Sequence, residues 1–190
     1  KILTVEDPVE YQLEGVNQVQ VQPQIGMTFA HALRSILRQD PDIIMIGEMR
    51  DTETAQIAVQ SALTGHLVLS TLHTNTAAAA IVRLEDMGIE RYLITSTVNG
   101  VLSQRLVRQL CPHCKKPVAH SDAVLQKTGL ARFTQGVKPA FAAPVGCPAC
   151  KHSGYLGRTS IHELFTMDAA AHKAILGGAD ATTLHNVARE

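Results

Sequence analysis

The sequence has 190 residues, of which 45% are apolar and 18% charged, and its 17 Lys and Arg residues balance its 17 Asp and Glu residues. This composition is typical of a globular chain and excludes a disordered or coiled-coil one, and the zero net charge argues against a nucleic-acid binder that relies on bulk electrostatics. The longest apolar run, Ala77 to Val82, has six residues, whereas a membrane-spanning helix needs about 20. The chain begins at Lys1 with neither Met nor a signal peptide, so we expect it to be an excised piece of a longer protein.

The first 110 residues alternate between the apolar periods of strands and of helices. Thr28 and Thr76 each precede a helical period and can cap it, and Gly88 can end one. In chain order, the sequence predicts strands over 2–5 and 16–21, a helix over 29–37, a strand over 43–46, a helix from Asp51 or Thr52 to Gly65, a strand over 67–72, and helices over 77–87 and about 91–110. This alternation predicts a mostly parallel sheet with helices on its faces.

Two of the predicted strands are expected in the core. Residues 43–46 form a continuous apolar run, which is typical of a parallel strand that is buried on both faces. We expect the strand over 67–72 to be buried as well.

The four cysteines fall into two Cys-Pro-x-Cys pairs, Cys111/Cys114 and Cys147/Cys150, with 32 residues between the pairs. Two residues between thiolates allow a tight turn to direct both sulfur atoms at one metal ion, and two such pairs supply a closed tetrahedral set. We therefore predict a structural Zn²⁺ ion that is held by all four cysteines.

The cysteines have other interpretations. Two disulfides are disfavoured by the absence of a secretory signal, and a redox Cys-x-x-Cys motif would not normally occur twice. His113 and His152 lie beside the pairs and could replace a thiolate ligand. Because four thiolates already complete the metal shell, we expect both histidines to be surface residues.

Residues 111–157 are rich in Pro and Gly and lose periodicity, apart from a short helix near 121–128. The sequence then predicts a strand over 159–165, a helix that Asp168 can cap and that runs to Leu176, and a last helix that begins at Thr182 and is cut off at Glu190. We therefore divide the chain into residues 1–110, a tetracysteine zinc module over 111–157, and a return strand with C-terminal helices over 158–190.

Acidic or imidazole side chains follow three of the predicted strands. Glu6 and Asp7 follow the first strand, Glu48 follows the strand over 43–46, and His73 follows the strand over 67–72. Ligands of an open parallel sheet bind outside the carboxyl ends of its strands, so we expect these side chains to converge. Two carboxylates and an imidazole suit phosphate chemistry, because they can hold Mg²⁺ through water, activate a water molecule and sense a terminal phosphate.

Each of these residues has a simpler interpretation when taken alone. Glu6 and Asp7 could mark a turn, Glu48 could pair with Arg50, and His73 could be a satisfied core histidine. Their matching positions after three strands favour a shared site.

Three stretches of the sequence resemble one protein family. They are residues 3–10 (LTVEDPVE), 38–51 (RQDPDIIMIGEMRD) and 63–75 (LTGHLVLSTLHTN). They are similar to the Asp box, Walker B and His box of the secretion ATPases, hexameric motors that power type II secretion and type IV pilus assembly. The resemblance runs through essentially the whole chain and implies a RecA-like α/β fold, in which a mostly parallel sheet with flanking helices is joined by a small zinc-binding module and C-terminal helices.

The resemblance also implies roles for individual residues. Glu6 would activate the attacking water, Glu48 would serve the Mg²⁺ and water network, and His73 would monitor the γ-phosphate. The supporting residues of the nucleotide site would be Asp7, Arg50 and His66. For His66, which follows a predicted helix, we also expect a hydrogen bond to the end of that helix. The cysteine pairs point to the type II secretion or pilus-extension branch, because the retraction motors of the family lack this metal module.

The sequence departs from the general pattern of phosphate-loop ATPases. No Gly in the chain is followed by Lys, so the glycine-rich loop that cradles the β and γ phosphates is missing. Gly47 stands where other members of that superfamily place a metal-binding Asp. We expect the phosphate loop and the arginine fingers upstream in the parent protein, and no ATP hydrolysis by this piece alone.

By the resemblance, the parent protein would be a cytoplasmic homo-hexamer that uses ATP and Mg²⁺ to drive protein export or pilus extension. It would associate with the inner membrane through platform and docking proteins and bind no nucleic acid. One alternative is a zinc-ribbon interaction module on a catalytically incomplete RecA-like scaffold, which a parent without a phosphate loop would favour. A helicase is disfavoured, since four Phe, three Tyr and no Trp offer little for stacking on single strands.

Overall fold

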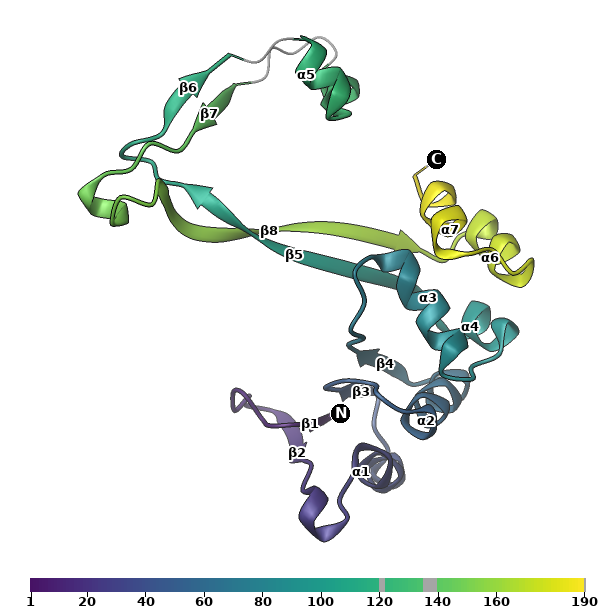
Figure 1. The fold of residues 1–190 in the computed structure, drawn as a ribbon. Coiled ribbons are helices and arrows are strands. Elements are labelled where there is room, and N and C mark those ends of the chain that lie inside the picture. The colour runs from purple at the N-terminus through teal and green to yellow at the C-terminus, as the bar shows by residue number, and fades with distance from the viewer. Residues whose placement is uncertain (120–121, 135–139, 190) are drawn as a thin grey trace. The chain divides into compact units, whose positions relative to one another are not determined.

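The computed structural model describes residues 1–119, 122–134 and 140–189. The chain divides into two compact units, unit 1 (Lys1–Ser103 and Glu163–Glu190) and unit 2 (Gln104–His162), whose elements are labelled in Figure 1. Ser121, at the predicted start of the short helix, and Glu190, at the predicted end of the last helix, lie outside the described residues.

Unit 1 is built on a parallel sheet. Its strands are β1 (Ile2–Glu6), β2 (Val16–Gln20), β3 (Ile43–Ile46) and β4 (Leu67–Ser70), in the order β2-β1-β3-β4. Each neighbouring pair is parallel, with Leu3 opposite Ile44 and Ile44 opposite Val68. The predicted parallel sheet is confirmed, and the carboxyl ends of β1, β3 and β4 meet at one edge of it.

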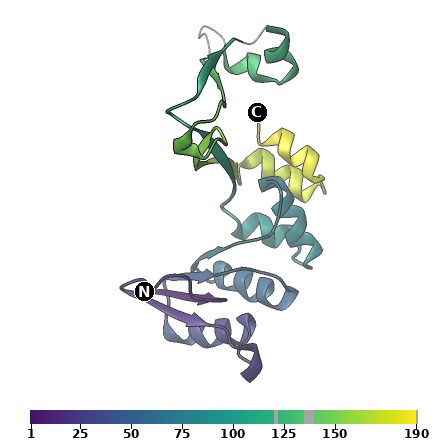
Figure 2. The same cartoon turned by 60° about the vertical axis from the view of Figure 1, so that its left-hand side comes forward.

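Helices α1 (Phe29–Ile36) and α2 (Thr52–Leu63) cover one face of this sheet (Figure 2). The side chains of Thr28 and Asp51 cap them, because Thr28 accepts the N–H of His31 and Asp51 accepts that of Thr54. Both helices bury their apolar sides against the same strand residues. The buried members of this core are Leu3, Val5, Val21, Ala32, Leu33, Ile36, Ile44, Ile46 and Ala58.

The opposite face of the sheet carries exposed apolar side chains, so the prediction that these strands are fully buried is wrong. Leu67 and Leu69 are 47% and 49% exposed, and in β3 only alternate residues are buried. The physical reason is that α1 and α2 pack on one face only, and β4 lies at the edge of the sheet. β4 also ends at Ser70, two residues earlier than predicted.

A second apolar core of unit 1 lies among α3 (Ala77–Asp86), α4 (Arg91–Thr97), α6 (Ala169–Leu176) and α7 (Ala181–Val187). Thr76, Asp168 and Asp180 cap three of these helices, so two of the predicted caps are confirmed and the last helix begins slightly earlier than predicted. The largest fully buried members of this core are Ile81, Ile94, Phe165, Ile175 and Leu184.

The predicted helix over residues 91–110 is wrong. α4 ends at Thr97, and residues 100–110 form the strand β5 (Gly100–Leu110), which pairs with β8 (Tyr155–Thr166). The last turn of α4 is rich in β-branched residues and Gly100 follows it, and both weaken a helix. β8 is also longer than the predicted strand over 159–165.

Unit 2 holds the cysteine pairs. Its other elements are the antiparallel strands β6 (Lys116–Val118) and β7 (Phe141–Ala143) and the short helix α5 (Asp122–Lys127). Short 3-10 turns lie at Pro23–Ile25 and Leu37–Gln39 in unit 1, and at Leu130–Phe133 and Pro148–Cys150 in unit 2. In the described part of the chain, no helix has the length and apolar character that a membrane crossing requires.

Candidate nucleotide site and metal centre

The parallel register brings the predicted acidic and imidazole residues to one edge of the sheet. Glu6 is the last residue of β1, while Glu48 and His73 follow the ends of β3 and β4. Backbone hydrogen bonds continue the parallel pairing past the ends of the strands. Gly47 N donates to Val5 O at 2.7 Å, and Met49 N donates to the carbonyl of Thr71 at 3.1 Å.

Gly47 allows β1 and β3 to approach closely at this edge. A Cβ atom at position 47 would lie 3.3 Å from Val5 O and 3.4 Å from the Cα atom of Glu6. Both distances are at or inside the limit of ordinary van der Waals contact, so a side chain at position 47 would require the facing backbone of β1 to shift by a few tenths of an ångström. An Asp at this position would therefore place a small strain on the backbone that carries Glu6.

Glu48 is the centre of a charged cluster. Its side chain is 11% exposed, it forms an ion pair with Arg50, and its Oε2 atom lies 3.1 Å from Nε2 of His73. The hydrogen bond from Arg50 lowers the pKa of Glu48, with help from His73 and against the effect of burial. The Glu48 pair and the nearby Asp7 charge in turn raise the pKa of Arg50. The cluster therefore keeps Glu48 ionised at neutral pH.

His73 is not a core histidine, because its side chain is 85% exposed. The imidazole extends from the sheet edge while one of its nitrogen atoms contacts Glu48. This arrangement leaves the ring accessible to a ligand outside the carboxyl ends of the strands.

Glu6 is half-buried, and two donors that the sequence did not point to hold its carboxylate. Thr4 Oγ1 donates to Oε1 of Glu6 at 2.5 Å, and Gln18 Nε2 donates to the same oxygen at 2.9 Å. Thr4 and Gln18 are directly opposite each other in β1 and β2. Only the pairing of these two strands could have pointed to Gln18, which is 12 residues from Glu6.

His66 lies elsewhere. It precedes β4, and its Nδ1 atom is 2.9 Å from Ser61 O in the last turns of α2, so the expected hydrogen bond at the helix end is confirmed. The structure places His66 at the amino end of β4 and His73 beyond its carboxyl end, and so does not bring the two histidines together.

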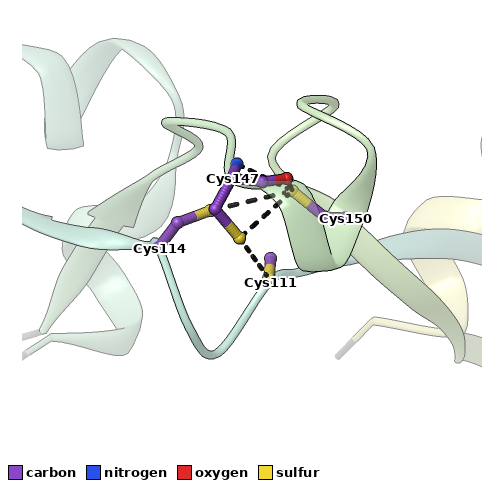
Figure 3. Close-up of side chains that lie close together, drawn as sticks. All are labelled: Cys111, Cys114, Cys147 and Cys150. Carbon is purple, nitrogen blue, oxygen red and sulfur yellow. Dashed lines mark hydrogen bonds between the residues drawn. The ribbon is translucent and has the colours of Figure 1, made fainter.

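The four cysteine side chains converge on one point in unit 2 (Figure 3). Their Sγ atoms all lie within 4.8 Å of one another. The separations are 3.9 Å for Cys111–Cys147, 3.9 Å for Cys114–Cys150 and 3.8 Å for Cys147–Cys150. A disulfide bond is about 2.05 Å long, so these are free thiols. Four sulfur atoms at about 2.3 Å from a tetrahedral metal ion would be about 3.8 Å apart, so the cluster fits a metal ion.

Backbone N–H groups surround the sulfur atoms of this cluster. Cys147 N and Gly154 N donate to Sγ of Cys150 at 3.2 and 3.3 Å, and Gly146 N donates to Sγ of Cys114 at 3.3 Å. Burial acts to raise the pKa of Cys150, but the two N–H donors, together with contacts to the Cys147 and Cys114 thiols, lower that pKa to about 6. Burial raises the pKa of Cys111 to about 11.

Tight turns of the backbone position the second cysteine pair. Gly154 has a φ of +76°, and a Cβ atom there would lie 2.6 Å from Cβ of Pro144. Gly146 has a φ of +107°, and a Cβ atom there would lie 2.7 Å from His152 O. Both positions therefore require glycine. His113 and His152 are exposed, as predicted.

Comparison with known proteins gives one consistent family. The family described as "Type II/IV secretion system protein" matches residues 1–190. The type II secretion system protein E of Dickeya dadantii is 57% identical over 177 residues, which cover 93% of this chain and 34% of that protein. The type IV pilus assembly ATPase PilB of Thermus thermophilus is 53% identical over 187 residues, which cover 98% of this chain and 21% of that protein.

Solved structures agree with the fold. The crystal structure of the pilus retraction motor PilT with bound ADP matches 98% of this chain and 43% of its own, with a TM-score of 0.63 and 30% identity. The chain spans about a third or less of the length of the two curated relatives from Dickeya dadantii and Thermus thermophilus.

Proposed function

Because the chain belongs to the family of type II/IV secretion system proteins, we propose that it is the part of a secretion or pilus-assembly ATPase that supplies the acidic residues of the nucleotide site and a structural zinc module. The observation that carries this proposal is the cluster of Glu48, Arg50 and His73 beside Glu6, at the carboxyl ends of paired parallel strands.

The two carboxylates have different surroundings, and this difference supports different roles. Glu48 is nearly buried and ionised between Arg50 and His73. It is therefore suited to act as a fixed negative charge that holds Mg²⁺ through water. Glu6 is half-buried, and its donors in the described residues both reach Oε1, so Oε2 can accept the proton of a water molecule. The accessible imidazole of His73 suits contact with a terminal phosphate.

ATP and Mg²⁺ would supply the reacting phosphate and its charge neutralisation at this edge, where Glu48, Glu6 and His73 would hold or orient them. The chain contains no Gly-Lys pair, so the phosphate cradle must come from residues outside it. We expect no hydrolysis by these 190 residues alone. Arg50 would support the site by keeping Glu48 charged, and Asp7 by placing a second negative charge near Arg50.

Zinc is the metal we assign to the cysteine cluster. Four thiolates in tetrahedral spacing, two of them buried, form a closed structural set rather than a catalytic one with an open position. The parent protein would assemble as a cytoplasmic hexamer and contact inner-membrane platform proteins, and it would couple ATP turnover to protein export or pilus extension.

Replacing Glu48 with Gln in the full-length protein tests the proposed role. Glu48→Gln keeps the shape of the side chain but removes its charge, so we expect nucleotide binding to be retained and turnover to fall by about two or more orders of magnitude. Glu53→Gln, on the exposed Arg34–Glu53 pair, is the matched control and should leave turnover unchanged. Wild-type turnover in Glu48→Gln would falsify the role of this carboxylate.

A further inference from the structure

Every polar atom of the Gln18 side-chain amide has a partner. Nε2 donates to Glu6 Oε1 and to Tyr11 O, both at 2.9 Å, and Oε1 accepts the N–H of Leu13 at 2.7 Å. The opposite orientation of the amide would place its oxygen against a carboxylate and a carbonyl oxygen, and its NH₂ group against an N–H donor. The contacts therefore fix which end of the amide faces Glu6.

The second donor to Glu6 comes from the same strand, β1. Thr4 is 2% exposed, and its hydroxyl reaches the same oxygen of Glu6 that Gln18 reaches. Two donors on Oε1, one from β1 and one from β2, set the plane and rotamer of the carboxylate. They also leave the other oxygen, Oε2, as the atom that can accept a proton.

We propose that Gln18, together with Thr4, is a positioning residue that orients the Glu6 carboxylate toward the attacking water. This inference rests on the proposed function, in which Glu6 activates that water. A reacting group that is held in one geometry gains rate over a mobile one, and small displacements of such a group are costly. Gln18 thereby acts on the rate of the chemical step through Glu6, without contacting the nucleotide.

Gln18→Met and Gln20→Met in the full-length protein form a matched pair of variants. Both residues are glutamines of β2, but the Gln20 side chain accepts the N–H of Val9 and, among the contacts of the described residues, reaches no carboxylate. We expect Gln18→Met to lower kcat about 10- to 100-fold with KM for ATP within about twofold, and Gln20→Met to stay within about twofold in both.

A double-mutant cycle separates positioning from general damage to the structure. In a Glu6→Gln background, Gln18→Met should cause no further loss of kcat, because the group that it orients has been removed. Multiplicative losses in the double variant would overturn the inference. If Gln18→Met lowers the thermal midpoint too far for assay, Thr4→Val removes the other donor with little change in shape and should give the same pattern; a Thr4→Val variant with unchanged kcat would also overturn it.

The same variants distinguish failure of this inference from failure of the proposed function. Wild-type turnover in Glu6→Gln would reject Glu6 as the activating carboxylate, and both proposals with it. An inactive Glu6→Gln, combined with equal activity in Gln18→Met and Gln20→Met, would reject the positioning role alone.

Discussion

Unit 1 and unit 2 are stabilised by different means. Unit 1 contains two clusters of buried apolar side chains, one between the sheet and its helices and one among helices. In unit 2, the buried apolar residues among those described are Cys111, Leu125 and Cys150, and two of these three belong to the metal centre. We therefore expect burial of apolar surface to stabilise unit 1, and metal binding by the cysteine cluster to stabilise unit 2.

The two units also differ in charge, although the chain as a whole is neutral. Unit 2 contains nine Lys and Arg residues and one Asp, a formal charge of +8, so the rest of the chain, with eight basic and 16 acidic residues, carries −8. The zero net charge thus averages two opposite regions. Charge therefore disfavours nucleic-acid binding by unit 1 only. For unit 2, which is basic, it is the scarcity of aromatic residues that disfavours binding to single strands.

Loss of the metal should have the largest effect and should be confined to unit 2. We expect chelation, or the double substitution Cys111→Ser and Cys114→Ser, to abolish hydrogen-exchange protection in unit 2 while unit 1 keeps its protection. Structural zinc contributes about 10–16 kcal/mol in small zinc-binding peptides, far more than the few apolar contacts of unit 2.

The exposed His113 provides the control, and His113→Ala should leave protection unchanged. If unit 2 is equally protected with and without metal, its structure does not depend on the cysteine cluster.

A cavity in the core beneath the sheet should destabilise unit 1 and leave the metal site of unit 2 intact. Leu33 is fully buried between α1 and the sheet, so Leu33→Ala should cost about 2–5 kcal/mol in the free energy of unfolding of unit 1. Zinc content, measured by atomic absorption, should remain at one ion per chain. Loss of zinc in this variant would show that the two units do not fold independently.

The charge difference should produce the smallest effect. Lys116 in unit 2 and Lys173 in unit 1 are both exposed, and changing either to Glu alters the net charge equally. On a cation-exchange matrix, Lys116→Glu should elute at lower salt than Lys173→Glu, because the matrix binds the basic region. Elution of both variants at the same salt concentration would contradict a segregated charge.

The sequence predicted the parallel sheet, the helix caps at Thr28, Thr76 and Asp168, and the convergence of the cysteines. Each of these depends on local spacing or on a capping side chain. Residues 100–110 were wrongly assigned to a helix, because short apolar patterns fit both a strand and a helix, and only the pairing with β8 decides between them.

Local sequence patterns could not predict that only one face of the sheet is covered, or which residues contact Glu6. An apolar run such as residues 43–46 does not say how many faces are covered, and Leu67 and Leu69 are exposed because no helix in the described part of the chain packs over them. Similarly, Gln18 reaches Glu6 only because β2 lies parallel to β1 with Thr4 opposite Gln18.

A structure of the full-length protein with Mg²⁺ and a non-hydrolysable ATP analogue would locate the triphosphate relative to the sheet. We expect the γ-phosphate at the carboxyl edge of the sheet, with His73 in contact with it, Glu48 beside the metal waters and Glu6 oriented by Gln18. Triphosphate density at the other edge, near His66, or a γ-phosphate remote from both glutamates, would contradict the proposed nucleotide site.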